Sequence, residues 1–202
     1  RILIAGFPHS GTSILRKILG NHPENFDYYE RETLLYREGG GLSALMKMLY
    51  RRYHGKKNIV FKWPFHEVET QTNATKILYI IRNPFDVFGS LRLRFGADLP
   101  DSHGPAAWRA YAQFFLEKRV SEKHFKLRYE DLFANDFGAL REAVQWVGPD
   151  WDDQMLKTDS RYAPIHYRGA LPQQEPSRSD HAAFRAWQTT QKLHDKTGES
   201  RR

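Results

Sequence analysis

The first residues of the chain join a hydrophobic run to a turn of small and hydroxyl-bearing residues. Residues 2–5 predict a buried strand, residues 6–13 read Gly-Phe-Pro-His-Ser-Gly-Thr-Ser, and residues 14–19 have helical spacing. A loop that leads from a strand to a helix start leaves several backbone N–H groups without helical partners, and the helix dipole favours negative charge there. The pattern therefore predicts a phosphate-binding loop. Its residues are His9, Ser10, Gly11, Thr12 and Ser13.

The spacing of Gly6 and Gly11 matches the first part of the loop that binds nucleoside triphosphates. That loop continues with a lysine that reaches the β- and γ-phosphates, whereas this chain has Thr12. A kinase also needs an acidic residue at a strand end to hold magnesium, and none directly follows the predicted strands 2–5, 58–62 and 76–81. A nucleotide or nucleoside kinase with a degenerate loop is therefore an alternative with two objections against it.

A second group of anion-binding residues follows another apolar strand. Residues 77–81 predict a buried parallel strand, and Pro84 suits the first turn of the helix that follows. Arg82 then lies at the carboxyl end of the strand, while Ser90 and Arg94, four residues apart, share one helix face. A guanidinium, a hydroxyl and a second cation around one anion predict a second phosphate site. Two such sites argue against an ordinary strand-to-helix connection at the first loop.

The two motifs together resemble those of the sulfotransferases that use 3′-phosphoadenosine 5′-phosphosulfate (PAPS). They are Phe-Pro-His-Ser-Gly-Thr-Ser at residues 7–13 and Ile-Arg-Asn-Pro-Phe-Asp-Val-Phe-Gly-Ser at residues 81–90, in the family's order. The resemblance implies the α/β fold of that family, a P-loop-like parallel sheet flanked by helices. It implies PAPS as the cofactor and 3′-phosphoadenosine 5′-phosphate (PAP) as its product. The first loop then holds the 5′-phosphosulfate, and the 3′-phosphate is held by Arg82, Ser90 and Arg94.

Within the family, the chain is most similar to the group that includes the tyrosylprotein sulfotransferases. In that group a His-Pro and then a Glu-Thr follow the first helix, and this chain has His22-Pro23 and Glu32-Thr33 with two extra residues between them. The resemblance implies that Glu32 is the catalytic base. It places Lys62, in the sequence Lys-Trp-Pro-Phe, beside the sulfuryl group, and it makes Tyr129 of Tyr-Glu-Asp-Leu a weaker nucleotide contact.

The chain also departs from the family's pattern. His9 stands where the family usually has lysine or arginine, so this group is titratable and acts either as a cation on the departing oxygen or as a neutral donor. The cytosolic aryl sulfotransferases have a histidine base at the position of Pro64, and the nearby His66 is out of place for it. Glu32 has an alternative role, an ion pair with a neighbouring arginine, either Arg31 or Arg37.

The mechanism that the resemblance implies is an in-line displacement at sulfur by an acceptor hydroxyl. Glu32 removes the acceptor's proton, while Lys62, His9 and the loop N–H groups stabilise the charge that develops on the leaving phosphate oxygen. No metal is required, and the nine histidines show no metal-ligand spacing. The acceptor class stays open among a carbohydrate, a small alcohol or phenol, a lipid and a peptide tyrosine. A further alternative is a non-catalytic domain that binds nucleotides or polyanions.

Composition agrees with an anionic small-molecule partner. The net charge of +7 and the isoelectric point near 9.6 favour anions, but the basic residues are spread along the chain, so we expect no nucleic acid partner. The chain has no cysteine and no apolar run long enough for a membrane segment, which favours a cytoplasmic location. Because it begins at a core strand without Met, a removed leader or anchor stays open, and with it a Golgi or secretory lumen.

The predicted elements alternate as in a parallel α/β sheet, and we expect one domain over residues 1–202 with a polar tail from about residue 188. A late loop over residues 163–179 resembles one that covers the nucleotide in the family, and Arg168 or Arg178 is a candidate phosphate contact there. The expected strands span 2–5, 58–62, 76–81 and 125–129, and the expected helices span 12–20, 41–53, 84–94, 105–120 and 136–147.

Overall fold

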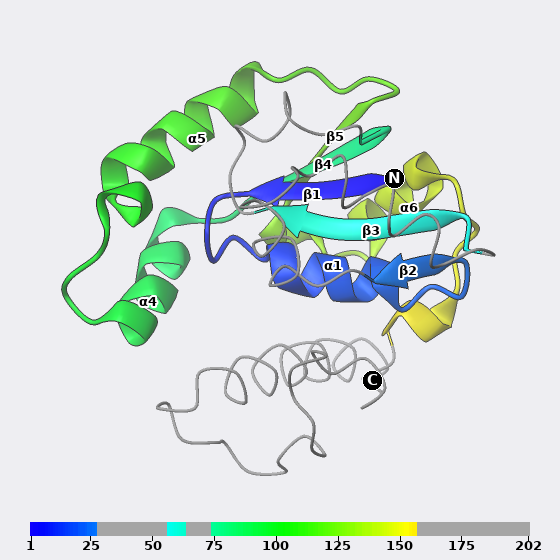
Figure 1. Cartoon of the computed structure of the whole chain (residues 1–202), viewed down its shortest axis with the longest axis horizontal. Helices are drawn as coiled ribbons and strands as arrows, with labels where there is room; N and C mark the ends of the chain where they lie inside the picture. The colour runs from blue at the N-terminus through cyan, green and yellow to red at the C-terminus, as the bar shows by residue number, and fades with distance from the viewer. Residues whose placement is uncertain (28–55, 64–73, 157–202) are drawn as a thin grey trace, which may run out of the picture.

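A parallel five-stranded sheet forms the centre of the molecule (Figure 1). The structure, a computed structural model, describes residues 1–27, 56–63 and 74–156. In spatial order the strands are β2 (Asn25–Asp27), β3 (Asn58–Trp63), β1 (Ile2–Gly6), β4 (Lys76–Ile81) and β5 (His124–Arg128). The helices are α1 (Thr12–Gly20), α4 (Pro84–Phe95), α5 (Pro105–Glu117) and α6 (Gly138–Val147). Three short 3-10 turns are η2 (Asp101–His103), η3 (Tyr129–Asp131) and η4 (Asp153–Leu156). The predicted α/β class is confirmed.

Helices cover both faces of the sheet, which explains why its central strands are almost entirely apolar. On one face, Ile2 and Ile4 of β1 pack in a core with α1 and α6. On the other face, Leu3 and Ala5 pack in a second core with α4 and α5. Because successive strand residues point to opposite faces, the run Ile-Leu-Ile-Ala supplies both cores at once.

The chain order of the strands separates two loops at the carboxyl edge of the sheet. β1 lies between β3 and β4, with Ala5 opposite Trp63 on one side and Tyr79 on the other. The helix after β1 packs on one face and the helix after β4 packs on the opposite face. The two loops therefore diverge where the connections change direction, which is where open α/β sheets bind their ligands. Both predicted anion motifs begin in these two loops and continue into the helices that follow, α1 and α4.

A buried tyrosine ties α5 to the ends of the two central strands. The Tyr111 hydroxyl donates to the Ile80 carbonyl oxygen at 3.0 Å and lies 3.4 Å from that of Ala5. Burial raises the pKa of Tyr111 well above its ordinary value, so the hydroxyl keeps the proton that it donates. This contact fixes α5 against the carboxyl ends of β1 and β4. The sequence pattern does not predict it.

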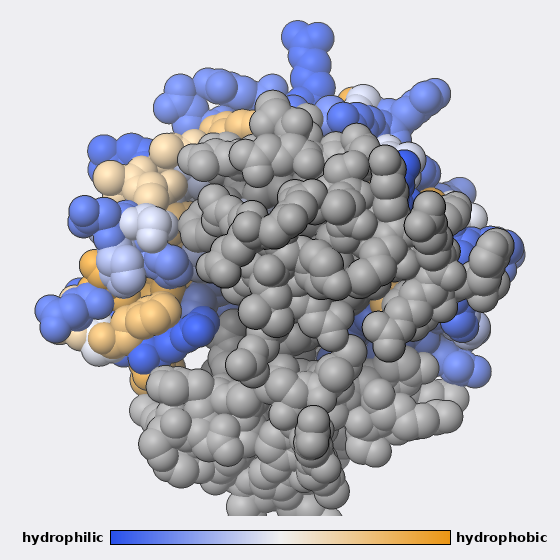
Figure 2. Space-filling model, in the orientation of Figure 1, coloured by the Kyte–Doolittle hydropathy of each residue, from blue (hydrophilic) through white to orange (hydrophobic). Residues whose placement is uncertain are grey.

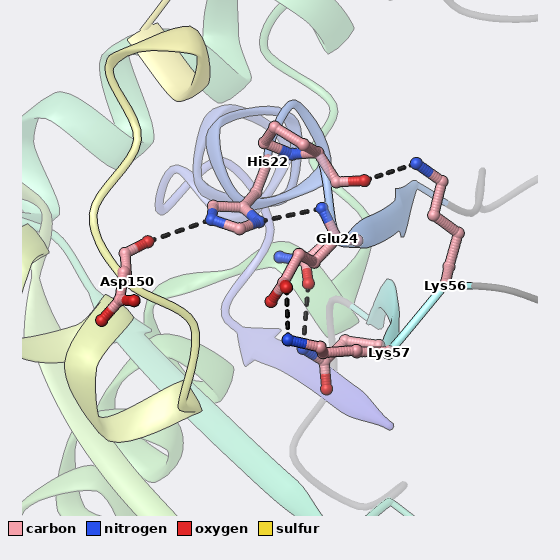
Figure 3. A network of polar contacts seen from close by, with 8 residues as sticks. His22, Glu24, Lys56, Lys57 and Asp150 are labelled. Atoms are coloured by element: carbon pink, nitrogen blue, oxygen red, sulfur yellow. Dashed lines mark hydrogen bonds and ion pairs between the residues drawn. The ribbon is translucent and has the colours of Figure 1, made fainter.

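β2 is absent from the sequence-based prediction, which has a polar connector at these residues. It has only three residues, and two of them are polar, so it lacks any detectable hydrophobic period. Polar contacts fix the turn before it, as Figure 3 shows. His22 Nδ1 accepts the Glu24 backbone N–H at 3.1 Å, which leaves Nε2 to donate to the Asp150 carbonyl oxygen at 3.0 Å. Lys56 donates to the Pro23 carbonyl, and Lys57 pairs with Glu24.

Two predicted helix ends differ from the observed ones by more than one residue. α5 ends at Glu117 rather than near residue 120, since Lys118 already has extended backbone angles. α6 begins at Gly138 rather than at residue 136, because Asn135, Asp136 and Phe137 all have positive φ angles and cannot continue a right-handed helix. The predicted helix 41–53, the late loop 163–179 and the polar tail lie outside the described residues.

Exposed apolar side chains occur on α4 and α5. Phe85 and Leu93 of α4 and Leu116 of α5 are more than half exposed. Figure 2 shows apolar residues between hydrophilic ones on the side of the molecule where α4 lies. Among the described residues, no helix has the length and hydropathy that a membrane span requires.

Candidate active site

The loop between β1 and α1 has the geometry of an anion cradle. Its backbone turns back at Ser10, whose N–H donates to the Phe7 carbonyl oxygen at 3.0 Å and whose hydroxyl donates to the same oxygen at 2.6 Å. α1 starts at Thr12 with no side-chain cap and no acidic residue in its first turn. The first N–H groups of the helix are thus available to an anion. The Ser10 hydroxyl and backbone N–H both donate within the loop, so Ser10 shapes the loop for the N–H groups that follow it.

Two glycines let the loop fold this tightly. A Cβ atom on Gly6 would lie 2.6 Å from Ser10 Oγ and 2.8 Å from the Ile80 carbonyl oxygen. Gly11 has a φ angle of 101°, and a Cβ atom there would lie 2.3 Å from the Tyr129 ring. The spacing of these glycines in the sequence therefore has a direct steric cause. His9, with a φ angle of 66°, completes the turn in a left-handed conformation that non-glycine residues adopt rarely.

Gly11→Ala is expected to lower the free energy of unfolding by about 2 kcal/mol, because it strains a left-handed backbone and displaces the Tyr129 ring. Gly89→Ala in α4 is the matched control. Its Cβ atom meets nothing within 4 Å, so this variant should gain about 0.5–1 kcal/mol from helix propensity. Denaturant unfolding of both variants tests the pair, and a Gly11→Ala protein as stable as the wild type would contradict the packing of Tyr129 on the loop.

Arg82 lies directly after β4, beside the loop. Its Nη1 atom is 3.4 Å from the His9 carbonyl oxygen, its guanidinium lies over the Tyr129 ring at 4.4 Å, and its Nη2 atom is 3.7 Å from Asp86. The buried Nε–H has no hydrogen-bond acceptor within the part of the chain that the structure describes. A buried donor without an acceptor is costly, and an anionic ligand would satisfy it.

His9 connects the first loop to the helix that carries the second predicted phosphate site. His9 Nδ1 and Ser90 Oγ lie 2.7 Å apart, within hydrogen-bonding distance. Through its carbonyl oxygen and its ring, His9 contacts both Arg82 and Ser90. Arg94, one turn beyond Ser90, stacks on Phe95 at 4.9 Å, and Phe95 in turn lies 6.4 Å from the His9 ring. The two motifs, far apart in the sequence, therefore meet at one place.

Tyr129 follows β5 and packs between the two motifs. Its ring contacts both Gly11 and the Arg82 guanidinium. Burial raises the pKa of the Tyr129 hydroxyl, the positive charge of Arg82 lowers it, and Asp86 and Glu130 raise it further. The Glu130 carboxylate accepts the Asn83 backbone N–H at 2.7 Å, which fixes the start of α4 against η3. The Tyr-Glu-Asp-Leu element thus holds Arg82 in position, through the Tyr129 ring and through the contact of Glu130 with the backbone next to Arg82.

Lys62 reaches the same loop from β3, on the opposite side from Arg82. Its ammonium group donates to Ser13 Oγ at 2.7 Å, and the residue is only 4% exposed. The first turn of α1 is thereby flanked by a lysine from one neighbouring strand and an arginine from the other. Such an arrangement can stabilise negative charge that develops on a ligand bound at the loop.

Several predicted residues lie outside the described residues: Glu32, His66, Arg168 and Arg178. Within the described ranges, no group of three or more histidine and acidic side chains is placed to hold a metal ion. Sequence reasoning missed Phe95, whose ring lies beside Arg94 and His9. A single aromatic residue at a helix end matches no functional motif. The one signal in the sequence is its position next to Arg94.

A tight glycine-containing loop after β1 and an arginine after β4, at the point where the sheet changes direction, are features of a P-loop-like α/β fold. The family model described as "Sulfotransferase domain" matches residues 1–163. The chain belongs to the sulfotransferase family, as its motifs predict.

Solved structures agree with this assignment at the level of the fold. The sulfotransferase domain from the Synechococcus PCC 7002 olefin synthase has 18% identity and a TM-score of 0.62, over 98% of this chain and 94% of that one. The sulfotransferase domain from the curacin biosynthetic pathway has 17% identity and a TM-score of 0.60, over 98% and 96%. A sulfotransferase from Alicyclobacillus acidocaldarius has 15% identity and a TM-score of 0.50, over 77% and 87%. A search of curated proteins finds no match.

Proposed function

We propose that this protein transfers the sulfuryl group of PAPS to the hydroxyl group of an acceptor. The observation that carries the proposal is the junction at His9, which joins a phosphate loop to an arginine with an unsatisfied buried N–H. A single phosphate would need only the loop. Two anion sites that share one residue fit a nucleotide with phosphate groups at both its 5′ and 3′ positions.

The described residues fit PAPS in their chemistry. The 5′-phosphosulfate belongs at the loop, where the backbone N–H groups of residues 11–13 and Lys62 supply donors. The 3′-phosphate belongs at Arg82 and Ser90, and Arg94 adds a second cation when it turns from Phe95. Thr12 in place of a lysine explains why a triphosphate suits the loop poorly.

We assign the roles in the reaction from these positions and, for Glu32, from the resemblance of its sequence motif to that of the family. PAPS, when bound, supplies the sulfuryl group. Glu32 takes the proton of the acceptor hydroxyl as its oxygen forms a bond to sulfur and the bond from sulfur to the phosphate oxygen breaks. Lys62, His9 and the loop N–H groups stabilise the negative charge left on that oxygen. The acceptor carries a hydroxyl group, and a carbohydrate, a small alcohol or phenol, a lipid and a peptide tyrosine are the candidates.

Calorimetric titration with PAP, ATP and ADP tests the nucleotide preference. PAP should bind with a micromolar or lower Kd, while ADP, which lacks the 3′-phosphate, and ATP should bind at least about tenfold more weakly. Equal binding of ATP would favour the kinase alternative. Binding of PAP together with no sulfuryl transfer from PAPS to any class of acceptor would favour a non-catalytic binding domain.

A further inference from the structure

A group of charged side chains lies where β2 meets α1, near Lys62. Asp27 ends β2, and its carboxylate Oδ1 lies 3.3 Å from Arg16 Nε of α1. The two side chains are 19% and 5% exposed, respectively. The end of α1 packs closely on β2: a Cβ atom added to Gly20 would lie only 2.5 Å from the Asp27 Cβ atom. The carboxylate is therefore held in place by packing as well as by the ion pair.

Three cations act on this carboxylate. Arg16 pairs with it directly, and Asp27 lies opposite Val60 of β3, two residues before Lys62. Burial raises the pKa of Asp27, and the positive charges of Arg16, Lys17 and Lys62 lower it. Lys17 and Lys62 are themselves almost fully buried. Buried ammonium groups are stable as cations only when a counter-charge compensates for their lost hydration. Asp27 supplies negative charge to the group.

The sheet geometry directs Lys62 from this group toward the loop. Val60 packs in the core that contains α1, and Lys62, two residues later, points to the same face of the sheet. Ser13 and Lys17 lie one turn apart on α1 and so share a helix face. Lys62 thus contacts Ser13 at the loop while its charge is compensated by Asp27 from the next strand.

We propose that Asp27 is a positioning residue that keeps Lys62 charged and directed at the bound phosphosulfate. This inference rests on the proposed function, because it assigns Lys62 to the nucleotide. If Asp27 only formed an ion pair with Arg16, its removal would change anion binding in the opposite direction. Removing a nearby negative charge alone would strengthen anion binding, whereas releasing Lys62 from Ser13 weakens it.

A double-mutant cycle tests the coupling. Lys62→Met should weaken PAP binding about tenfold, and Asp27→Asn about fivefold, as measured by calorimetry. Because Asp27 acts through Lys62, adding Asp27→Asn to Lys62→Met should change the Kd by less than about twofold. Asn25→Ala is the matched control: Asn25 lies on the same strand, and its amide donates to the Leu19 carbonyl oxygen, outside the charge group. It should lower Tm and leave PAP binding within about twofold.

The outcomes separate the two proposals. Tighter PAP binding by Asp27→Asn, or a loss that adds fully to that of Lys62→Met, overturns the role of Asp27 and leaves the proposed function standing. A wild-type protein that does not bind PAP overturns both. If Asp27→Asn does not fold, PAP binding is measured on Arg16→Met instead. This variant breaks the ion pair and keeps Asp27 beside Lys62. PAP binding within about twofold of wild type then supports the proposal, and a loss equal to that of Lys62→Met overturns it.

Discussion

Arg82→Ala is expected to weaken PAP binding by about a hundredfold, because a charge-assisted hydrogen bond from a buried arginine contributes about 1.5–3 kcal/mol. The side chain is 15% exposed, and the Tyr129 ring and the His9 carbonyl already hold the guanidinium in position. Little entropy is therefore lost when it binds a phosphate. Calorimetric titration of the variant with PAP measures the effect.

The choice of nucleotide supplies the control for this variant. ADP lacks the 3′-phosphate, so Arg82→Ala should leave ADP binding within about threefold. The affinity of Arg82→Lys for PAP should lie between those of the wild type and of Arg82→Ala, because an ammonium group keeps the charge but lacks the paired N–H donors of a guanidinium. An equal loss of PAP and ADP would mean that Arg82 supports the loop through His9 and Tyr129 instead of holding the 3′-phosphate. The Tm of each variant shows how much of the effect comes from the fold.

The part of the site that the sequence predicts is the part built on two buried strands. β1 and β4 are uninterrupted apolar runs, so their ends are marked by Gly6 and Arg82, and parallel strands bring both ends to one edge. The glycine spacing of the first loop reflects steric contacts within the loop itself and with the neighbouring strand. Local sequence therefore suffices to predict that the ends of these two strands meet.

The contacts that the sequence does not predict are those between elements with no pattern of their own. β2 is too short to show a period, so the approach of Asp27 to α1 has no signal except the small residue Gly20. The distance between His9 and Ser90 depends on how α4 leaves the sheet. Tyr111 resembles any other apolar residue of an amphipathic helix until its hydroxyl meets a strand end. These are tertiary contacts, and single-sequence patterns carry no information about them.

The largest expected effect comes from a residue just after β2. Glu32 follows Asp27 by five residues. Glu32→Gln is expected to reduce sulfuryl transfer by about a hundredfold to ten-thousandfold, because glutamine cannot accept the proton of the acceptor hydroxyl. PAP binding should stay within about twofold, since the role of a base is exerted in the transition state. Turnover with PAPS and calorimetry with PAP measure the two quantities on the same protein.

Glu30→Gln is the matched control for this variant, because it removes the same charge two residues earlier. It should leave turnover within about threefold. Equal losses in both variants would mean that the negative charge of the segment matters rather than a base at one position. If Glu32→Gln lost turnover and PAP binding together, the ion pair with Arg31 or Arg37 would be the better account. Full activity in Glu32→Gln would move the search for the base to His66, the histidine nearest to the position that serves in the aryl sulfotransferases. In the proposed in-line displacement, the base at either position acts on the acceptor hydroxyl, which approaches sulfur from the side opposite the leaving phosphate oxygen.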